Sequence, residues 1–385
     1  MESINKQTAE QRFSEHEAAL QELSTWMYHN PELAYVEHET SAKMAEALRN
    51  GGFEVEHPAY GLDTAFEAKI GTKGPRVVIC AEMDALPEVG HACGHNIIAT
   101  AGIGAGIALG AVAEDLGIRV TVLGTPAEEN FGGKVDLINA GAFKDAAASM
   151  MIHPSSKDLV DPLFLAIDHL DVDFYGKEAH ASGSPEIGIN ALDAAVQAYT
   201  NVAALRQHIL DSDRIHGIIT HGGAAANIVP AHTSMSWYVR SQTDERLEVL
   251  GDRVRKCFEA AAVATGCRYE ITPRGYRYKN IRNDKVLAKL YHTNTAAAGR
   301  PMPMYADIEP FTSGSTDMGN VSYELPSIHP MLSLDCLPAV NHQKEFAAAT
   351  LTEKGMQTIR DGAIAMAWTT IDLAEQDLWD QLGTF

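Results

Sequence analysis

Apolar residues recur with helical spacing over residues 10–50, and this segment stops at a Gly-Gly pair, 51–52, which suits the end of a helix. Two short apolar runs, 77–81 and 120–123, are typical of buried strands. Between them, residues 97–113 are uncharged and rich in Gly and Ala, and they predict a buried helix rather than a membrane span. Buried strands alternating with helices predict an α/β layer with a largely parallel sheet.

The pattern changes near residue 165. Strands and helices are then predicted, in order, at 165–175 (strand), 187–208 (helix), 215–220 (strand), 233–240 (strand), 244–265 (helix) and 268–272 (strand). This β-α-β-β-α-β order is that of a ferredoxin-like unit. After about residue 275 the helical and strand patterns resume. We therefore predict a small α+β domain, 167–275, inserted into an α/β domain formed by 1–166 and 276–385.

Length and charge narrow the classes of function. A chain of 385 residues is long enough for about two domains. The formal charge of −21 argues against a nucleic-acid partner and against docking on an anionic membrane surface. The first 23 residues are polar and lack the apolar core of a signal peptide, so we expect a cytoplasmic protein with reduced thiols. Its five cysteines, which form no C-x-x-C pair, are Cys80, Cys93, Cys257, Cys267 and Cys336.

Residues that carry chemistry gather in segment 81–96, directly after a predicted strand. Ligands bind at the carboxyl ends of strands in open α/β sheets. Cys93 and His95 are two residues apart, so a loop can direct both toward one ion, and thiolate with imidazole suits zinc or another late transition metal. The alternative is a buried Cys beside a helix-capping His. The nearby Asp84 and His91 make that alternative less favourable.

Three further signals are weak singly. Glu128 and Glu129 follow the second predicted strand, where one carboxylate can bind metal while the other carries a proton. His153 closes another apolar run, and His342 lies near the C-terminus. An isolated Glu-Glu pair is more often a solvated loop, and an isolated His is more often a core or surface residue. Taken together with Cys93, these residue types match a dinuclear metal site.

The motifs D-A-L-P, H-A-C-G-H-N, T-P-A-E-E and M-I-H-P, with a late His, resemble the two-metal peptidases typified by aminoacylase and the bacterial glutamate carboxypeptidases. The branch resembled most holds aminobenzoyl-glutamate hydrolase, hippurate and auxin-conjugate amidohydrolases, and an aminoacylase-like cytosolic dipeptidase. The resemblance covers nearly the whole chain, and segments 178–192 and 222–230 match the family's lid. It implies a zinc-peptidase-like catalytic domain with a mixed, largely parallel sheet, and an inserted lid that pairs two chains into a homodimer.

The resemblance also implies roles. Glu128 is the general base, Asp84 orients a metal-binding residue, and His180 on the lid donates to the oxyanion, in the active site of the partner subunit. The implied ligands of two divalent metal ions are Cys93, His95, Glu129, His153 and His342. The implied contacts to a substrate carboxylate are Asn227, Arg240, Ser313, Gly314, Ser315 and Thr316. Zinc is the expected metal, with manganese, cobalt or nickel as alternatives. For Arg240 and His180, the alternative is that each is a surface side chain without a role in the site.

One departure from the family concerns Glu82, which stands before Met83-Asp84 where much of the family has His-x-Asp. The departure removes one expected ligand and leaves the metal count and the bridging ligand open. Glu82 is then itself a candidate ligand. His329, in Ser327-Ile328-His329, is an alternative to His342.

Together with the candidate metal site, the resemblance implies a metal-dependent hydrolase that cleaves the amide bond of dipeptides or N-acyl amino acids with a free carboxylate. A serine hydrolase is disfavoured because the chain contains no G-x-S-x-G nucleophile elbow. A second alternative is a non-catalytic relative that binds a carboxylate ligand in the same cleft. The presence of Glu128 beside Glu129 argues against it.

Overall fold

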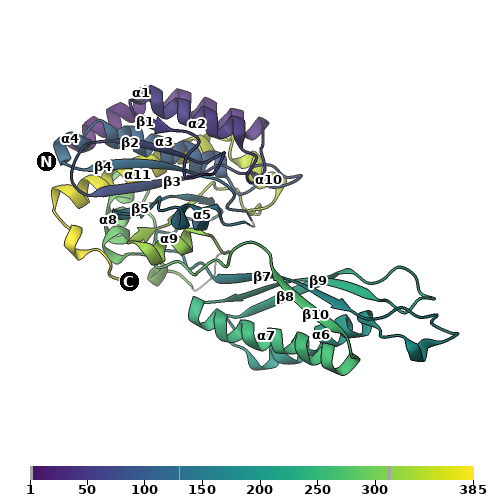
Figure 1. Cartoon of the computed structure of the whole chain (residues 1–385). Helices are drawn as coiled ribbons and strands as arrows, with labels where there is room; N and C mark the ends of the chain where they lie inside the picture. Colours follow the sequence, from purple (N-terminus) through teal and green to yellow (C-terminus); the bar gives the residue numbers. More distant parts are fainter. Residues whose placement is uncertain (1–2, 130, 310–313) are drawn as a thin grey trace. The chain divides into compact units, whose positions relative to one another are not determined.

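The computed structural model describes residues 3–129, 131–309 and 314–385, and the chain divides into two compact units (Figure 1). Unit 1 comprises Met1–Leu163, Ile281–Ser313 and Asp317–Phe385, and unit 2 comprises Phe164–Asn280 with Gly314–Thr316. The chain of unit 1 is thus interrupted by unit 2. The domain boundaries drawn from the sequence remain a prediction.

A six-stranded sheet forms the centre of unit 1. Its strands, in spatial order, are β1 (Glu54–Glu56), β2 (Phe66–Ile70), β4 (Arg119–Thr125), β3 (Arg76–Glu82), β5 (Ala146–Met150) and β11 (Ser327–Ile328). β3 runs parallel to both β4 and β5, and β11 runs parallel to β5. β2 is antiparallel to β1 and β4. The predicted α/β fold with a mixed, largely parallel sheet is therefore confirmed. Two short strands, β6 (His153–Ser155) and β12 (Met331–Ser333), form a separate parallel pair.

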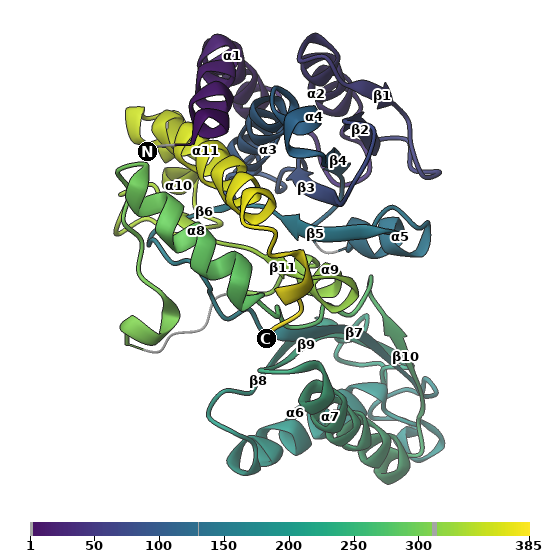
Figure 2. The same cartoon turned by 90° about the vertical axis from the view of Figure 1, so that its left-hand side faces the viewer.

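Helix α3 (His95–Gly110) is buried along almost its entire length and packs on β3 and β4. Figures 1 and 2 show α1 (Ile4–His29) and α11 (Glu353–Glu375) lying against α3. A Cβ on Gly106 would lie 2.2 Å from Val122 Cγ2, so this close packing of helix on sheet requires glycine. The other helices of unit 1 are α2 (His38–Asn50), α4 (Ala113–Leu116), α5 (Gly133–Asn139), α8 (Lys285–Ala297), α9 (Met318–Glu324), α10 (Lys344–Ala349) and the short 3₁₀ helices η3 (Tyr305–Asp307) and η4 (Trp379–Gln381).

The helical pattern predicted over residues 10–50 is two helices rather than one. α1 ends at His29, and α2 begins only at His38. Pro31 accounts for the break, because proline lacks an N–H group and disfavours helical backbone at the residue before it. No helix among the described residues has the length and apolar character needed to cross a membrane.

Unit 2 has the predicted β-α-β-β-α-β order. Its elements are β7 (Ala166–Tyr175), η1 (Pro185–Ile187), α6 (Ala191–Leu205), η2 (Arg206–His208), β8 (Arg214–His221), β9 (His232–Ser241), α7 (Asp244–Thr265) and β10 (Arg268–Pro273). The sheet is antiparallel in the order β10-β7-β9-β8. Leu170, Val172 and Trp237 lie in the core that the sheet forms with α6 and α7. Alternate positions of β9, such as Tyr238 and Arg240, are only partly buried, as strand alternation requires.

Candidate active site

The carboxyl ends of three neighbouring strands bring the predicted site residues of unit 1 together. Glu82 is the last residue of β3, and β4 ends at Thr125 just before segment 126–129. β5 ends at Met150, three residues before His153. Because β3 is parallel to β4 and β5, these ends lie on one edge of the sheet, where open α/β sheets place their ligand sites.

Potential ligand atoms converge at this edge in overlapping groups of three. Within each group, one such atom per residue lies within 4.8 Å of the others. The groups are Cys93–His95–His153, Cys93–Glu129–His342, His95–Glu128–Glu129 and Glu82–Glu128–Asp317. The five residues predicted to hold metal thus share one cluster with Glu128. Neither Glu82 nor Asp317 belongs to the first three groups, but both adjoin them through Glu128.

Asp84 fixes the orientation of two members of the cluster. His95 Nδ1 lies 2.7 Å from the carbonyl oxygen of Asp84 and 3.1 Å from its Oδ1. Both neighbours are acceptors, so Nδ1 carries a hydrogen, and Nε2 is directed into the cluster. Nε2 lies 3.3 Å from Glu82 Oε2 and 4.0 Å from Glu129 Oε1. The other carboxylate oxygen of Asp84 accepts the backbone N–H of Glu129 at 2.9 Å.

Gly94 allows the Cys93–His95 loop to approach His153. It precedes α3 with a φ of +83°, and a Cβ at this position would lie 2.8 Å from Pro154 Cγ. His153 Nδ1 donates to the carbonyl oxygen of Pro154 at 2.7 Å, which leaves its Nε2 free of hydrogen. Burial lowers the pKa of His153 to about 4, so the ring is neutral at pH 7, as a metal ligand must be.

His342 and His329 occupy different surroundings. The backbone N–H of His342 donates to the carbonyl oxygen of Ala92 at 2.9 Å, and His342 Nε2 lies 4.0 Å from Glu129 Oε1. His329 is fully buried, and its ring centroid lies 5.4 Å from that of His153. Of the two, His342 alone belongs to a group of potential ligands among the described residues.

The chemistry of the cluster suits a cation. Burial, then Glu82 and Glu129, raise the pKa of Glu128 well above its ordinary value. Burial and the Glu129 carboxylate likewise raise the pKa of the Cys93 thiol. Within the described part of the chain, the buried atoms His95 Nε2, Glu82 Oε2 and Glu129 Oε1 have no hydrogen-bond partner. Buried polar atoms of this kind are ordinarily paired or bind a metal ion.

Lys134, which no sequence motif indicated, lies fully buried between Glu82 and Asp317. Its Nζ is 2.5 Å from Glu82 Oε1 and 2.6 Å from Asp317 Oδ1, and its backbone N–H donates to Asp317 Oδ2 at 2.9 Å. Burial opposes the charge on Lys134, but Asp317 and Glu82 outweigh this effect and raise its pKa. One oxygen of Glu82 is therefore held by an ammonium group, while the other faces His95.

Within unit 2, the predicted lid residues His180 and Asn227 lie beside each other. His180 pairs with Ile228 in an isolated bridge, and the N–H of Ala181 donates to the carbonyl oxygen of Asn227 at 3.0 Å. His180 Nδ1 accepts the N–H of Gly183 at 3.0 Å. The hydrogen of the neutral ring is therefore on Nε2, where it can be donated to another group.

Arg240 lies on β9 and is partly buried. Its Nη1 donates to Ser315 Oγ at 3.2 Å, and burial lowers its pKa. Gly314 accepts the N–H of Leu165 at 3.0 Å, and Thr316 is buried. Arg240 thus lies against the predicted Ser/Thr loop, of which Ser313 is outside the described residues.

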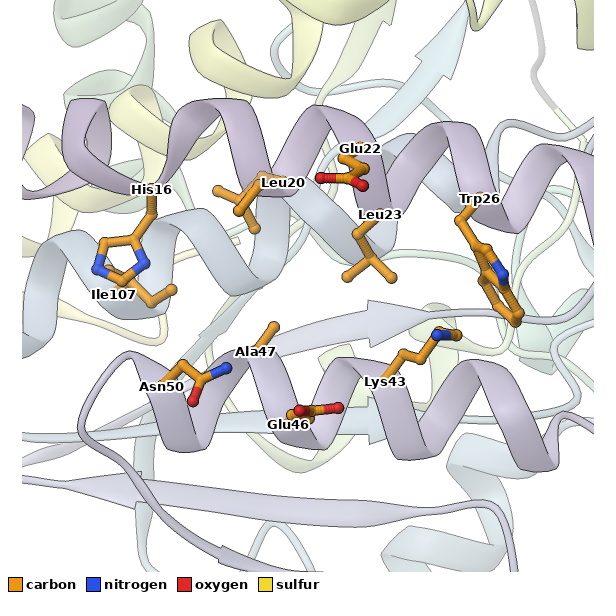
Figure 3. A pocket seen from close by; sticks show the side chains of 11 residues that line it. His16, Leu20, Glu22, Leu23, Trp26, Lys43, Glu46, Ala47, Asn50 and Ile107 are labelled. Carbon is orange, nitrogen blue, oxygen red and sulfur yellow. The ribbon is translucent and has the colours of Figure 1, made fainter.

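A separate pocket of about 260 Å³ lies between α1 and α2 (Figure 3). Leu20, Leu23 and Ala47 line it, and Lys43 Nζ lies 4.6 Å from the ring centroid of Trp26. Among its described lining residues there is no predicted catalytic or metal-binding side chain, so this pocket is distinct from the cluster.

Comparison with known proteins shows that the chain is similar to peptidases and amidohydrolases. Residues 167–266 match the family described as "Peptidase dimerisation domain". The chain is 38% identical over 387 residues to the Xaa-Arg dipeptidase of Mus musculus, covering 96% of this chain and 88% of the relative. It is 27% identical over 426 residues to one of the subunits of p-aminobenzoyl-glutamate hydrolase from Escherichia coli (strain K12). This match covers 91% of this chain and 88% of the relative. A crystal structure of a dinuclear metal-binding peptidase of the M20 family from Bacillus subtilis has a similar fold, with a TM-score of 0.69 and 21% identity over 92% of this chain and 99% of that one.

Proposed function

Because this chain belongs to the M20 peptidase family, which is metal-dependent, we propose that the cluster at the ends of β3, β4 and β5 is its active site. The chain is a hydrolase, and it cleaves the amide bond of dipeptides or N-acyl amino acids. The observation that carries the assignment of the site is the convergence of Cys93, His95, Glu129, His153 and His342 around a buried Glu128.

The proposed ligands of two divalent metal ions are Cys93, His95, Glu129, His153 and His342. A set of thiolate, imidazole and carboxylate donors favours zinc, with manganese, cobalt and nickel as alternatives. When bound, such ions polarise the amide carbonyl and lower the pKa of a water molecule to about 7. Lys134 already holds Glu82 Oε1, so we assign Glu82 to charge balance, and its other oxygen, which faces His95, makes it a further candidate ligand. A ligand thiolate persists in a reducing compartment, which is consistent with a cytoplasmic enzyme.

Glu128 is the proposed proton carrier. It takes a proton from the attacking water and returns it to the leaving amine, while Asp84 holds His95 and the backbone of Glu129 in place. His180 has its hydrogen on Nε2 and donates it to the oxyanion of the tetrahedral intermediate. Arg240 and Asn227, with the 313–316 loop, bind the substrate carboxylate, for which a guanidinium is well suited.

For the substrate, we propose dipeptides whose C-terminal residue is basic. The support is the 38% identity to a dipeptidase named for Xaa-Arg, together with the formal charge of −21, which attracts cationic substrates over a distance. The expected preference is measured as kcat/KM for Ala-Arg, Ala-Leu and Ala-Glu at low and high salt. Equal values for the three dipeptides would contradict it.

A homodimer through unit 2 is the proposed assembly. β8 is an edge strand of its sheet, and Ile218 and Ile219 on it are 63% and 38% exposed. Val196 and Tyr199 of α6 are also exposed apolar residues. Unpaired strand edges and exposed apolar side chains are commonly buried in the two-fold symmetric interface of a homodimer. We expect Ile218→Lys to shift the protein to monomer in light scattering, whereas an unchanged mass would exclude this edge.

The proposed chemistry is tested by dipeptide hydrolysis with and without a chelator, followed by measurement of bound metal. Hydrolysis should stop when the chelator removes the metal and resume when zinc, manganese, cobalt or nickel is returned. Unchanged hydrolysis by metal-free protein would rule out the proposed site.

A further inference from the structure

The segment between α1 and α2 touches both loops that carry the proposed catalytic carboxylates. The backbone N–H of Ala85, next to Asp84, donates to the carbonyl oxygen of Glu32 at 2.8 Å, and Leu33 forms an isolated parallel bridge with Ala85. At the end of this segment, Glu37 reaches the loop that precedes Glu128. The segment between α1 and α2, which periodicity predicted as part of a helix, therefore supports the edge of the sheet where the proposed active site lies.

Glu37 is fully buried, and each of its carboxylate oxygens has a defined partner. Oε1 accepts the backbone N–H of Ala127 at 2.9 Å, and Oε2 accepts the hydroxyl of Thr64 at 2.9 Å. The carbonyl oxygen of Ala127 accepts the N–H of Gly132 at 3.0 Å. The backbone of Ala127 is therefore held on both sides.

Ala127 needs such support, because its φ of +58° is in the left-handed region that non-glycine residues rarely adopt. Conformations of this kind persist where the surrounding structure determines them. On the far side of Glu128, the N–H of Glu129 is held by Asp84 at 2.9 Å. Glu128 is thus placed between two backbone N–H groups, each bound by a buried carboxylate.

We propose that Glu37 is a positioning residue that fixes the backbone at Ala127 and thereby aims the Glu128 carboxylate at the reacting water. This inference rests on the proposed function, in which Glu128 is the proton carrier. The length of the Glu37 side chain matters here, because it places an acceptor oxygen 2.9 Å from the Ala127 nitrogen. The hydrogen bond from the Ala127 N–H requires an acceptor at that distance but does not require a charged one. Burial and the Asp84 charge raise the pKa of Glu37 to about 7, which is consistent with a neutral group working equally well there.

Two substitutions distinguish the position of the Glu37 acceptor oxygen from the charge of its carboxylate. Glu37→Gln keeps an oxygen at the same distance and removes the charge, whereas Glu37→Asp keeps the charge and withdraws the oxygen by one methylene. We expect kcat of the Gln variant to stay within about threefold of wild type. We expect kcat of the Asp variant to fall about 10- to 100-fold, with KM and metal content unchanged, because misplacement by about 1 Å can cost that much.

Thr64→Val is the matched control, because it removes the other partner of the same carboxylate and leaves the bond to Ala127 intact. It should retain kcat within about threefold while losing some stability. The reverse order, with Glu37→Asp active and Glu37→Gln impaired, would overturn the proposal. So would a loss of bound metal in the Asp variant, since that would indicate a general structural role.

Glu37→Asp in the Glu128→Gln background distinguishes this proposal from the proposed function itself. If Glu37 acts through Glu128, the second substitution lowers the residual activity no further, whereas a structural role lowers it by the same factor as in wild type. If Glu128→Gln alone retains full activity, the role of Glu128 is wrong. If Glu128→Gln is inactive and Glu37→Asp has wild-type kcat, only the positioning role is wrong.

Discussion

At the scale of residues, the carboxylates of the proposed active site differ in their contacts, and these contacts suggest a different role for each. Glu82 is held by the ammonium group of Lys134, and Asp84 is held by His95 and the N–H of Glu129. Glu128 is buried, and its pKa is raised by that burial and by the charges of Glu82 and Glu129. These contacts support the proposed roles, which are charge balance for Glu82, orientation for Asp84 and proton transfer for Glu128.

Replacing Lys134 by Met should be strongly destabilising. It leaves Glu82 and Asp317 buried without their cation, and breaking a buried ion pair from one side costs about 3–5 kcal/mol. Lys354→Met is the control, because Lys354 pairs with Asp335 at 3.3 Å on the surface, where ion pairs contribute about 0–1 kcal/mol. The free energy of unfolding in urea gives both values. Equal losses for the two variants would show that the buried ammonium has no special role.

The spacing of residues in the sequence could indicate Cys93 and His95, because they are two residues apart in one loop. It could not indicate Lys134 and Asp317, which are separated by 183 residues and meet only in the folded chain. Glu37 gave no signal either, since a Glu in a helical pattern is ordinarily exposed. The polar residues that support a site are therefore identified by contacts between segments distant in the sequence, and not by local sequence motifs.

At the scale of elements, strands such as β3, β4, β7 and β9 followed from periodicity, because each buries one face or both. The break between α1 and α2 was missed because helical spacing continues on both sides of Pro31. The order of strands in the sheet could not be read from the sequence, since β11 joins the sheet beside β5 from a distant part of the chain. The carboxyl edge was nevertheless predictable, because parallel strands end together.

His169 on β7 should make the protein sensitive to acid. Burial, then Arg240 and Arg274, lower its pKa to about 4 from 6.5, so between these pH values the unfolded chain binds a proton that the folded chain does not. Stability therefore falls as the pH drops from 6.5 to 4, by an amount of about 1–3 kcal/mol for this group.

His169→Phe keeps a ring beside Tyr238, whose centroid lies 4.5 Å from that of His169, and it cannot take a proton. Urea unfolding of both proteins at pH 7 and pH 4.5 measures the effect. The variant should lose less stability than wild type over this interval, and a parallel loss in both would contradict the expected role of His169.

At the scale of the whole molecule, the chain divides into a unit with the proposed metal-binding cluster and a unit with His180. If His180 serves the partner subunit, as the family resemblance implies, neither a His180→Ala nor a Glu128→Gln homodimer has a working site. A mixed dimer then has one site with both lesions and one with neither. After exchange in equal amounts, about half the dimers are mixed and roughly a quarter of all sites should recover.

That recovery is measured as dipeptide hydrolysis after subunit exchange, against each variant alone. Exchange itself is followed separately with two differently tagged chains. No gain in activity despite demonstrated exchange would place His180 and Glu128 of each site in one chain, and it would leave the assignments of the metal ligands unaffected.

Proton transfer by Glu128 is tested most directly by the kcat of Glu128→Gln at a metal content equal to that of wild type. The amide keeps the size of the side chain but cannot accept a proton from water. We expect kcat to fall by roughly 10²-fold or more, with metal binding and substrate binding retained, since general-base catalysis contributes at least that much. Near-normal turnover by the metal-loaded variant would contradict the assignment of Glu128.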